Sequence, residues 1–279
     1  MSTARIASLH CYPLKSARGL PLNAARLLPT GIEHDREWLL VDARDRFMTQ
    51  RELPQLATLD VQVSHDSLQL RAPARPPLAV SLRVAGAARR VRIWQDECAA
   101  LDCGDEAANW LSTWLGQPLR LVRFDAHVPR HCDRQWTGAI SAPSQFQDGF
   151  PLLVANAASL DDLNARMAHP LPMERFRPNI VLDELPAWAD DRILELHTDA
   201  VRLRLVKPCT RCIITTTDQT SGVRDSDEPL RTLRSFRYDP QLPGLTFAWN
   251  AIVIAGAGAM LNVAEHFNVA WRAPASGAG

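Results

Sequence analysis

Two cysteines separated by two residues form the densest group of potentially reactive side chains in the sequence. They lie in Val206-Lys-Pro-Cys-Thr-Arg-Cys-Ile-Ile-Thr-Thr-Thr-Asp218, where Lys207 and Arg211 accompany the pair Cys209 and Cys212. A neighbouring cation favours the thiolate form of cysteine, which binds metals and attacks disulfides. The pattern predicts a metal ligand or a redox-active thiol, with two buried and unreactive cysteines as the alternative.

Two specific forms of thiol chemistry fit this segment less well. A structural zinc site needs four nitrogen or sulfur ligands, and the only candidate partners are His127 and His131, about 80 residues upstream in a proline-broken loop. A thioredoxin-like pair opens a helix, whereas the β-branched residues 213–217 that follow Cys212 favour a strand. Both remain alternatives on these residues alone.

Cationic side chains at the ends of predicted strands could bind an anionic ligand. Lys15 and Ser16 place an ammonium beside a hydroxyl, just before Gly19, which can turn the chain. Such a pair can hold a phosphate. Arg36 and the segment Arg175-Phe-Arg-Pro-Asn179 each precede another predicted strand. Taken singly, each of these groups is more typical of a solvated turn or a surface charge.

The elements that must position these residues are mainly strands, because apolar side chains alternate with a period near two. Strands are predicted at residues 4–12, 37–42, 47–50, 56–64, 67–71, 78–84, 119–124, 179–183, 192–196, 201–207, 213–217, 247–255 and 260–264. Helices are predicted at 105–115, from an N-cap at Ser159 to 167, and from Pro229 to 236. The fold class is therefore mainly β with peripheral helices (α+β), in two β-barrel-like units.

Residues 123–144 are the weakest stretch for regular structure, since they contain Pro129, Gly138 and Pro143 and show no sustained period, which indicates a domain junction or a functional loop. We place a boundary near residue 130, so that one β-barrel domain spans 1–130 and a second spans 131–270. The small residues of 271–279 predict a flexible tail.

Composition excludes several classes of protein. The 31 Lys and Arg residues balance 31 Asp and Glu residues, so no net charge favours nucleic acid or an anionic membrane. The uncharged segment 241–264 is interrupted by proline, glycine and asparagine, which favours two buried strands around a Gly-Ala-Gly turn over a membrane span. Six scattered cysteines and the absence of an export signal predict a cytoplasmic protein.

Taken together and in order, these segments resemble proteins that carry the MOSC domain, named for the molybdenum cofactor sulfurase C-terminus. The matching segments are Tyr12-Pro-x-Lys-Ser16, Asp35-Arg36, Trp94-x-Asp96, Asp102-Cys-Gly-Asp-Glu-Ala-Ala-x-Trp-Leu-Ser112, Ala158-Ser-Leu-x-Asp-Leu-Asn164, Phe176-Arg-Pro-Asn179, Cys209-x-Arg-Cys212 and Pro229-Leu-x-Thr-Leu-Arg-Ser235. The resemblance covers nearly the whole chain and is greatest to the mitochondrial amidoxime-reducing component and its bacterial counterparts. It implies a MOSC N-terminal β-barrel domain followed by a MOSC β-barrel domain.

The resemblance also implies a site for a molybdenum cofactor. In the family a cysteine thiolate binds molybdenum directly, and the matching residue is Cys212, with Cys209 as its neighbour rather than a ligand. A soft thiolate suits this metal. The residues that match cofactor-binding segments are Lys15, Ser16, Arg36 and Arg177, with Asn179, Thr210, Arg211 and backbone groups around Asn156 to Ser159 as further contacts. An acidic group sometimes present just before Ala158 is absent here, so no proton donor is assigned to that position.

The activity implied by the resemblance is molybdenum-dependent reduction of small N-oxygenated substrates, such as hydroxylamines, amidoximes and N-hydroxylated bases. No cysteine follows Cys212, so no fused iron–sulfur cluster is expected, and electrons must come from a separate flavoprotein, ferredoxin or haem protein. Without a mitochondrial-type leader or membrane anchor, a bacterial cytoplasmic form is expected. Two alternatives are a carrier that binds the cofactor or sulfur without turnover, and a barrel without cofactor that serves as an interaction module.

Overall fold

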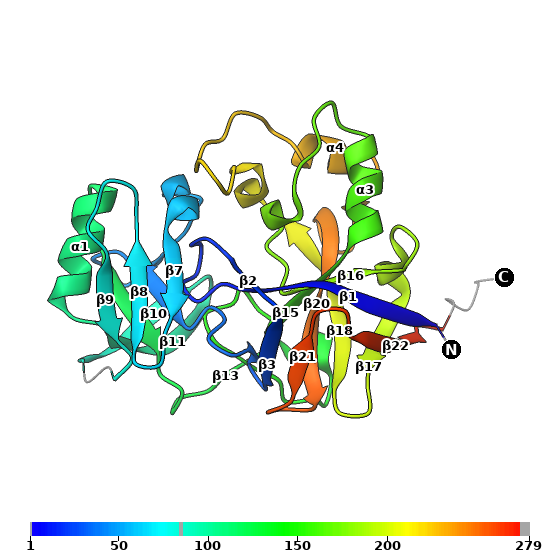
Figure 1. Ribbon diagram of the computed structural model, residues 1–279, viewed down its shortest axis with the longest axis horizontal. Coiled ribbons are helices and arrows are strands. Elements are labelled where there is room, and N and C mark those ends of the chain that lie inside the picture. Colours follow the sequence, from blue (N-terminus) through cyan, green and yellow to red (C-terminus); the bar gives the residue numbers. More distant parts are fainter. Residues whose placement is uncertain (1, 84–85, 274–279) are drawn as a thin grey trace.

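The computed structural model describes residues 2–83 and 86–273 of the chain. Strands dominate and form two units that lie side by side (Figure 1). One unit contains β7–β11 and the helix α1 (Asp105–Leu115), and the other contains a closed barrel with the helices α3 (Ala157–Ala165) and α4 (Leu230–Arg234). The predicted fold class, mainly β with peripheral helices, is confirmed.

Seven strands close into a barrel because β15 pairs with both β16 and β20. In spatial order they are β15 (Leu152–Asn156), β16 (Ile180–Asp183), β1 (Thr3–Cys11), β22 (His266–Trp271), β17 (Ile193–His197), β18 (Arg202–Arg211) and β20 (Gly244–Ala255), with β2 (Leu20–Leu22) and β19 (Tyr238–Asp239) at the margins. Alternate side chains such as Ile6, Leu203 and Phe267 fill its core without any exposure. The first strand of the chain thus shares a core with the last.

The unit beside the barrel combines two smaller sheets and one helix. Its five-stranded sheet contains β10 (Ala88–Ile93), β11 (Asp96–Asp102), β12 (Arg120–Phe124), β5 (Trp38–Val41) and β6 (Phe47–Met48), and its three-stranded sheet contains β7 (Asp60–Val63), β8 (Ser67–Arg71) and β9 (Leu78–Ser81). Leu111 and Trp110 on α1 pack against Trp38 and Leu40 on β5. Burial of this aromatic and aliphatic cluster fixes β5 and the turn that precedes it.

The remaining elements are short connections. They are β3 (Ala24–Leu28), β4 (Gly31–Ile32), β13 (Arg130–His131), β14 (Pro143–Ser144), β21 (Met260–Asn262), α2 (Arg134–Thr137) and the 3₁₀ helices η1 (Pro54–Thr58), η2 (Met173–Arg175), η3 (Ala189–Arg192) and η4 (Ile213–Thr216). The irregular stretch 123–144 therefore contains β13, α2 and β14. Within the described residues no helix combines the length and apolar character needed to cross a membrane.

Three sequence-based element predictions are wrong. Residues 213–216 form the 3₁₀ helix η4 instead of a strand, because the Thr215 and Thr216 hydroxyls donate to the carbonyls of residues 212 and 213. Helix α3 starts at residue 157, before the predicted N-cap Ser159, because the Asn156 side chain caps it instead. The strand expected at 56–64 starts only at residue 60, since Pro54 begins η1.

Domain limits remain a prediction. The strand β1 lies between β16 and β22 in the barrel, so residues 3–11 pair with segments from the second half of the chain. The strand β22 extends to Trp271, which was expected to begin a tail, and residues 274–279 of that tail lie outside the described residues.

Candidate functional site

A cavity of about 450 Å³ is lined by residues from both units. Its walls come from the segments after β1, β6 and β10, the turn before β5, the segments that precede β15 and β16, and the barrel strands β15, β18 and β20. Its cationic lining residues are Lys15, Arg36, Arg51, Arg177, Lys207 and Arg211, and the one carboxylate among the lining residues is Asp148. The chain has only two lysines, and both line this cavity.

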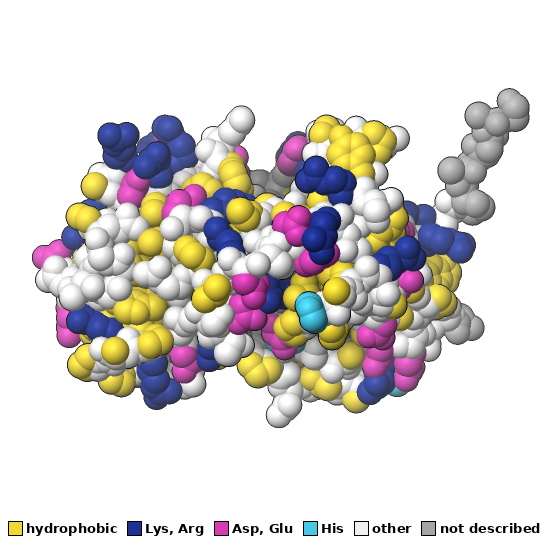
Figure 2. Space-filling model, turned by 90° about the horizontal axis from the view of Figure 1, so that it is seen from above, with side chains coloured by type: hydrophobic (Ala, Val, Ile, Leu, Met, Phe, Trp, Pro, Cys, Tyr) yellow, Lys and Arg dark blue, Asp and Glu magenta, His cyan; other side chains and the backbone are white. Residues whose placement is uncertain are grey.

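This concentration of positive charge is local. The whole chain has equal numbers of basic and acidic residues, and basic and acidic side chains are interspersed over the face drawn in Figure 2. Six cations against one carboxylate in a cavity therefore favour an anionic ligand, because low-dielectric walls strengthen the field of the lining charges.

Two of the six cations are neutralised by acids. Lys15 Nζ donates to Asp148 Oδ1 at 2.8 Å and to the Phe146 carbonyl at 2.7 Å, and burial lowers the pKa of this ammonium while Asp148 opposes the shift. Arg36 donates to Asp35 at 2.7 and 2.8 Å. Among the described residues, no carboxylate forms a salt bridge with the other four lining cations, at positions 51, 177, 207 and 211. These four carry the uncompensated charge.

Arg177 is the most informative of the four. Arg177 is only 8% exposed. Its Nη1 atom donates to Gln219 Oε1 at 3.1 Å, whereas its Nη2 atom has no hydrogen-bond partner among the described residues. Burial lowers the pKa of Arg177 to about 10; the Tyr12 hydroxyl opposes this shift and Arg36 adds to it. A buried, unpaired guanidinium donor is costly unless a ligand accepts its hydrogen bond.

Arg36 and Arg177 are held next to each other by one tyrosine. Their guanidinium carbons lie 4.2 and 4.3 Å from the centroid of the Tyr12 ring, and Arg36 Nη2 donates to the Arg177 carbonyl at 3.1 Å. Gly19 permits this arrangement because a Cβ there would overlap the Tyr12 ring. The glycine that the sequence suggested as a turn residue thus serves close packing.

Four lining residues adopt a backbone conformation that side chains disfavour. Ser16, Arg36, Trp94 and Arg177 have φ values of 72°, 51°, 55° and 57°. A left-handed non-glycine residue costs on the order of 1 kcal/mol, and such strain concentrates at functional sites. The segments that carry the cations are therefore fixed by their surroundings in positions that stability alone does not favour.

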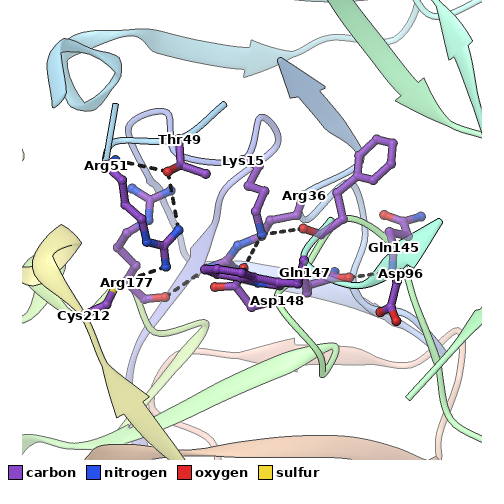
Figure 3. Close-up of polar contacts among 12 residues, drawn as sticks. Lys15, Arg36, Thr49, Arg51, Asp96, Gln145, Gln147, Asp148, Arg177 and Cys212 are labelled. Carbon is purple, nitrogen blue, oxygen red and sulfur yellow. Dashed lines mark hydrogen bonds and ion pairs between the residues drawn. The ribbon is translucent and has the colours of Figure 1, made fainter. Parts of the chain in front are cut away.

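The cysteine pair lies at the end of β18, where the strand is irregular. Its pairing with β20 shifts register between Pro208 and Thr210, so that the strand bulges at Cys209, and Cys212 then caps η4. Arg51 Nη2 donates to Cys212 Sγ at 3.2 Å (Figure 3), and Arg211 Nη1 donates to Cys209 Sγ at 2.9 Å. Because a guanidinium has no acceptor atom, both sulfurs are hydrogen-bond acceptors.

The other cysteines lie outside the cavity lining. All six thiols are free, and burial raises the pKa of Cys103 to about 12 and that of Cys132 to about 11. Within the described parts of the chain, no three His, Cys, Asp or Glu side chains come together as a metal site, so the zinc alternative lacks a ligand set. His131 instead shares a hydrogen bond with Ser141 at 3.2 Å.

Most of the residues expected from the sequence meet in this cavity. Its lining includes Lys15, Ser16, Arg36, Arg177, Asn179, Thr210, Arg211 and Cys212. The Asn179 side chain is already committed within the protein, since Oδ1 accepts from the Leu153 amide at 3.1 Å and Nδ2 donates to Asp35 at 2.9 Å. Asn179 therefore positions Asp35, which in turn holds Arg36.

Two residues of the expected contact segment do not line the cavity. Asn156 and Ser159 are absent from the cavity lining, and both side chains are buried with partners of their own. Asn156 caps α3 and donates to the Pro186 carbonyl at 2.7 Å, while the Ser159 hydroxyl donates to Asp190 at 3.0 Å. Both residues therefore stabilise the start of α3.

Sequence reasoning missed several lining residues, among them Thr49, Arg51, Gln147, Asp148 and Asn250. Arg51 is one of 29 arginines and has no local motif, so its approach to Cys212 depends on tertiary structure alone. Trp94 belongs to a matching segment but received no role. The irregular stretch 123–144, suggested as a functional loop, contributes no lining residue.

Comparison with known proteins assigns the family. Residues 3–118 match the MOSC N-terminal beta barrel domain, and residues 142–261 match the MOSC domain. Mitochondrial amidoxime-reducing component 1 of Mus musculus is 34% identical over 83% of this chain and 71% of its own length. The chain belongs to the MOSC-domain family.

Two human relatives also support the assignment of this MOSC-domain protein to the family. Mitochondrial amidoxime-reducing component 1 of Homo sapiens is 33% identical, and component 2 is 34% identical, each over 83% of this chain and 72% of its own length. The resemblance drawn from ordered segments of the sequence is thereby confirmed. The relatives are named for the reduction of amidoximes, which is an oxidoreductase activity.

Proposed function

We propose that this chain is a molybdenum-cofactor-dependent reductase of N-hydroxylated compounds. One observation carries the proposal: a single cavity joins the Cys212 sulfur to an excess of cationic side chains. Two of these, Arg177 and Arg211, each have a buried donor nitrogen without a partner among the described residues. A metal-binding thiolate and an anion-binding wall are the two features that a molybdenum bound to a phosphorylated pterin requires.

The residues present fit such a group. In this proposal Cys212 supplies the thiolate ligand of molybdenum, and the anionic part is held by Lys15, Ser16, Arg36, Arg177 and Arg211. Thr210 also lines the cavity and is exposed, so it is available as a further contact. The Asn156 and Ser159 side chains are engaged within the protein, so a contact from their segment would come from its backbone groups.

When bound, the cofactor supplies a redox-active metal that can accept an oxygen atom from an N–O group. The chain's own contribution is preorganisation. Asp35 accepts hydrogen bonds from the Tyr12 amide, the Asn179 amide and Arg36, so the Arg36 guanidinium is fixed before any ligand arrives. Arg51 holds the Cys212 sulfur from the opposite unit, and this contact restricts the orientation of the thiolate.

The reaction class requires two electrons from outside the site. We assign their delivery to a separate flavoprotein, ferredoxin or haem protein. The six free thiols suit a reducing compartment, and we propose a bacterial cytoplasm.

The test is to purify the protein from a host that makes the cofactor, measure bound molybdenum, and follow reduction of benzamidoxime with a chemical electron donor. The proposal expects stoichiometric molybdenum and turnover. Molybdenum without turnover would refute the reductase in favour of a carrier, and absence of molybdenum would refute both.

A further inference from the structure

One half-exposed tryptophan at the cavity is fixed by a hydrogen bond and an aromatic contact. Trp94 follows β10 and is 49% exposed, yet its indole Nε1 donates to Asp148 Oδ1 at 3.1 Å. The Phe47 ring meets it edge-on with a centroid separation of 5.1 Å. Its φ of 55° is a strained conformation for a bulky residue.

The Trp94 ring also contacts the guanidinium of Arg51, the residue that donates to the cysteine. The Arg51 guanidinium carbon lies 4.5 Å from the Trp94 ring centroid, and Arg51 Nη2 donates to Cys212 Sγ at 3.2 Å. A flat indole and a flat guanidinium thus lead from the exposed edge of the cavity to the sulfur. Figure 3 shows Arg51 extending toward Cys212.

Arg51 itself is fixed by a clasp from the barrel unit. Arg224 donates to the carbonyls of Gln50 and Arg51, and the Gln50 and Gln219 side-chain amides bond each other reciprocally at 3.0 Å. Gln50 is fully buried and also donates to the Ser16 carbonyl at 2.7 Å. The backbone of Arg51 is therefore tied to both units, which preorganises the surface formed with Trp94.

We propose that Trp94 and Arg51 form a stacking platform that selects planar, delocalised N-hydroxylated substrates, such as aryl amidoximes and N-hydroxylated bases, over aliphatic ones. This inference rests on the proposed reductase function. Flat π systems stack on tryptophan and on guanidinium planes, and such stacking is worth about 1–3 kcal/mol per base, roughly fivefold to more than a hundredfold in affinity. An aliphatic amidoxime offers no π face to this surface.

The platform is tested with the holoprotein and two probes, benzamidoxime and acetamidoxime, which share the reacting group and differ in the ring. We expect Trp94→Ala to lower kcat/KM for benzamidoxime about tenfold, mainly through KM, and to change acetamidoxime less than twofold. Trp94→Phe should retain most of the preference, and Trp94→Leu should lose it. Tyr238→Ala, which removes an aromatic side chain that is 58% exposed and outside the cavity lining, is the matched control.

A binding measurement separates this inference from the proposed function. Calorimetric titration of both probes into the holoprotein without any reductant reports affinity in the absence of turnover. Selective weakening of benzamidoxime binding in Trp94→Ala supports the platform even if the wild type reduces neither probe, an outcome that refutes only the reductase. Equal effects on both probes, or no effect on either, in variants with wild-type circular dichroism and molybdenum content overturn the platform.

Discussion

Arg177 should strengthen binding of the cofactor and lower the free energy of unfolding of the cofactor-free protein. The perturbation is Arg177→Met, which removes the charge and keeps an apolar side chain of similar length. Burial lowers the pKa of Arg177 from its ordinary value to about 10, which corresponds to a cost of about 3 kcal/mol for the buried cation. Because the folded-state pKa lies below the unfolded one, this cost is full at every pH below about 10.

The interactions lost with Arg177 offset most of that cost. The hydrogen bond to Gln219 contributes about 1 kcal/mol and the contact with the Tyr12 ring about another 1 kcal/mol. Gln219 Oε1 keeps the Gln50 amide as a donor, so the substitution leaves no orphaned acceptor there. We expect the cofactor-free Arg177→Met protein to be about 1 kcal/mol more stable than the wild type.

The assay is urea denaturation of protein made in a host that cannot synthesise the cofactor, together with molybdenum analysis of protein from a competent host. The matched control is Arg175→Met, because Arg175 is equally buried but donates to Asp218 at 3.0 Å and to the Thr216 carbonyl at 2.9 Å. That control should lose about 2 kcal/mol, since it removes the donor of two hydrogen bonds, one of them to a carboxylate. Destabilisation of Arg177→Met as strong as that of the control, or molybdenum content at the wild-type level, would contradict this role of Arg177.

Two further predictions concern the start of α3. Burial raises the pKa of Asp190 from 3.8 to about 6, so the stability that its neutral form provides is present below about pH 4 and is lost as the pH rises through 6. Asp190→Asn should therefore be up to about 3 kcal/mol more stable than the wild type at pH 7.5 and little more stable at pH 4. Equal gains in urea titrations at both pH values would contradict this. Asn156→Ala should cost about 1–2 kcal/mol by removing the cap of α3 and the bond to Pro186, while molybdenum content stays at the wild-type level; loss of molybdenum from the folded variant would return Asn156 to the site.

The sequence predicts the fold class and the main site residues for physical reasons that differ. Strand periodicity is a local property, so β5, β8, β16 and β20 were expected close to where they lie. Three cation-bearing segments and the cysteine segment each precede or follow a strand, and these strand ends meet between the two units, so Lys15, Arg36, Arg177 and Cys212 line one cavity. The order of the matching segments along the chain, which carries the family resemblance, indicated that these residues belong to one site; no single motif did so.

Long-range contacts account for what sequence reasoning missed. Pairing of β1 with β22 joins residues more than 250 positions apart, and no periodicity encodes it. Arg51 reaches Cys212 only because Gln50 and Arg224 clasp the two units together. The helix η4 is the exception, because there the competing contacts are local: threonine hydroxyls donate to carbonyls three residues earlier, against the strand propensity of the β-branched run.

The central claim is that the Cys212 sulfur binds molybdenum in this cavity. The most direct measurement is the molybdenum content, by elemental mass spectrometry, of wild-type, Cys212→Ser and Cys209→Ser proteins purified in parallel from a cofactor-producing host. Cys209 is the matched control because it lines the same cavity and also accepts a hydrogen bond from an arginine. The account predicts full metal in the wild type and in Cys209→Ser and strong depletion in Cys212→Ser. Equal molybdenum in all three proteins, or depletion only in Cys209→Ser, would contradict it.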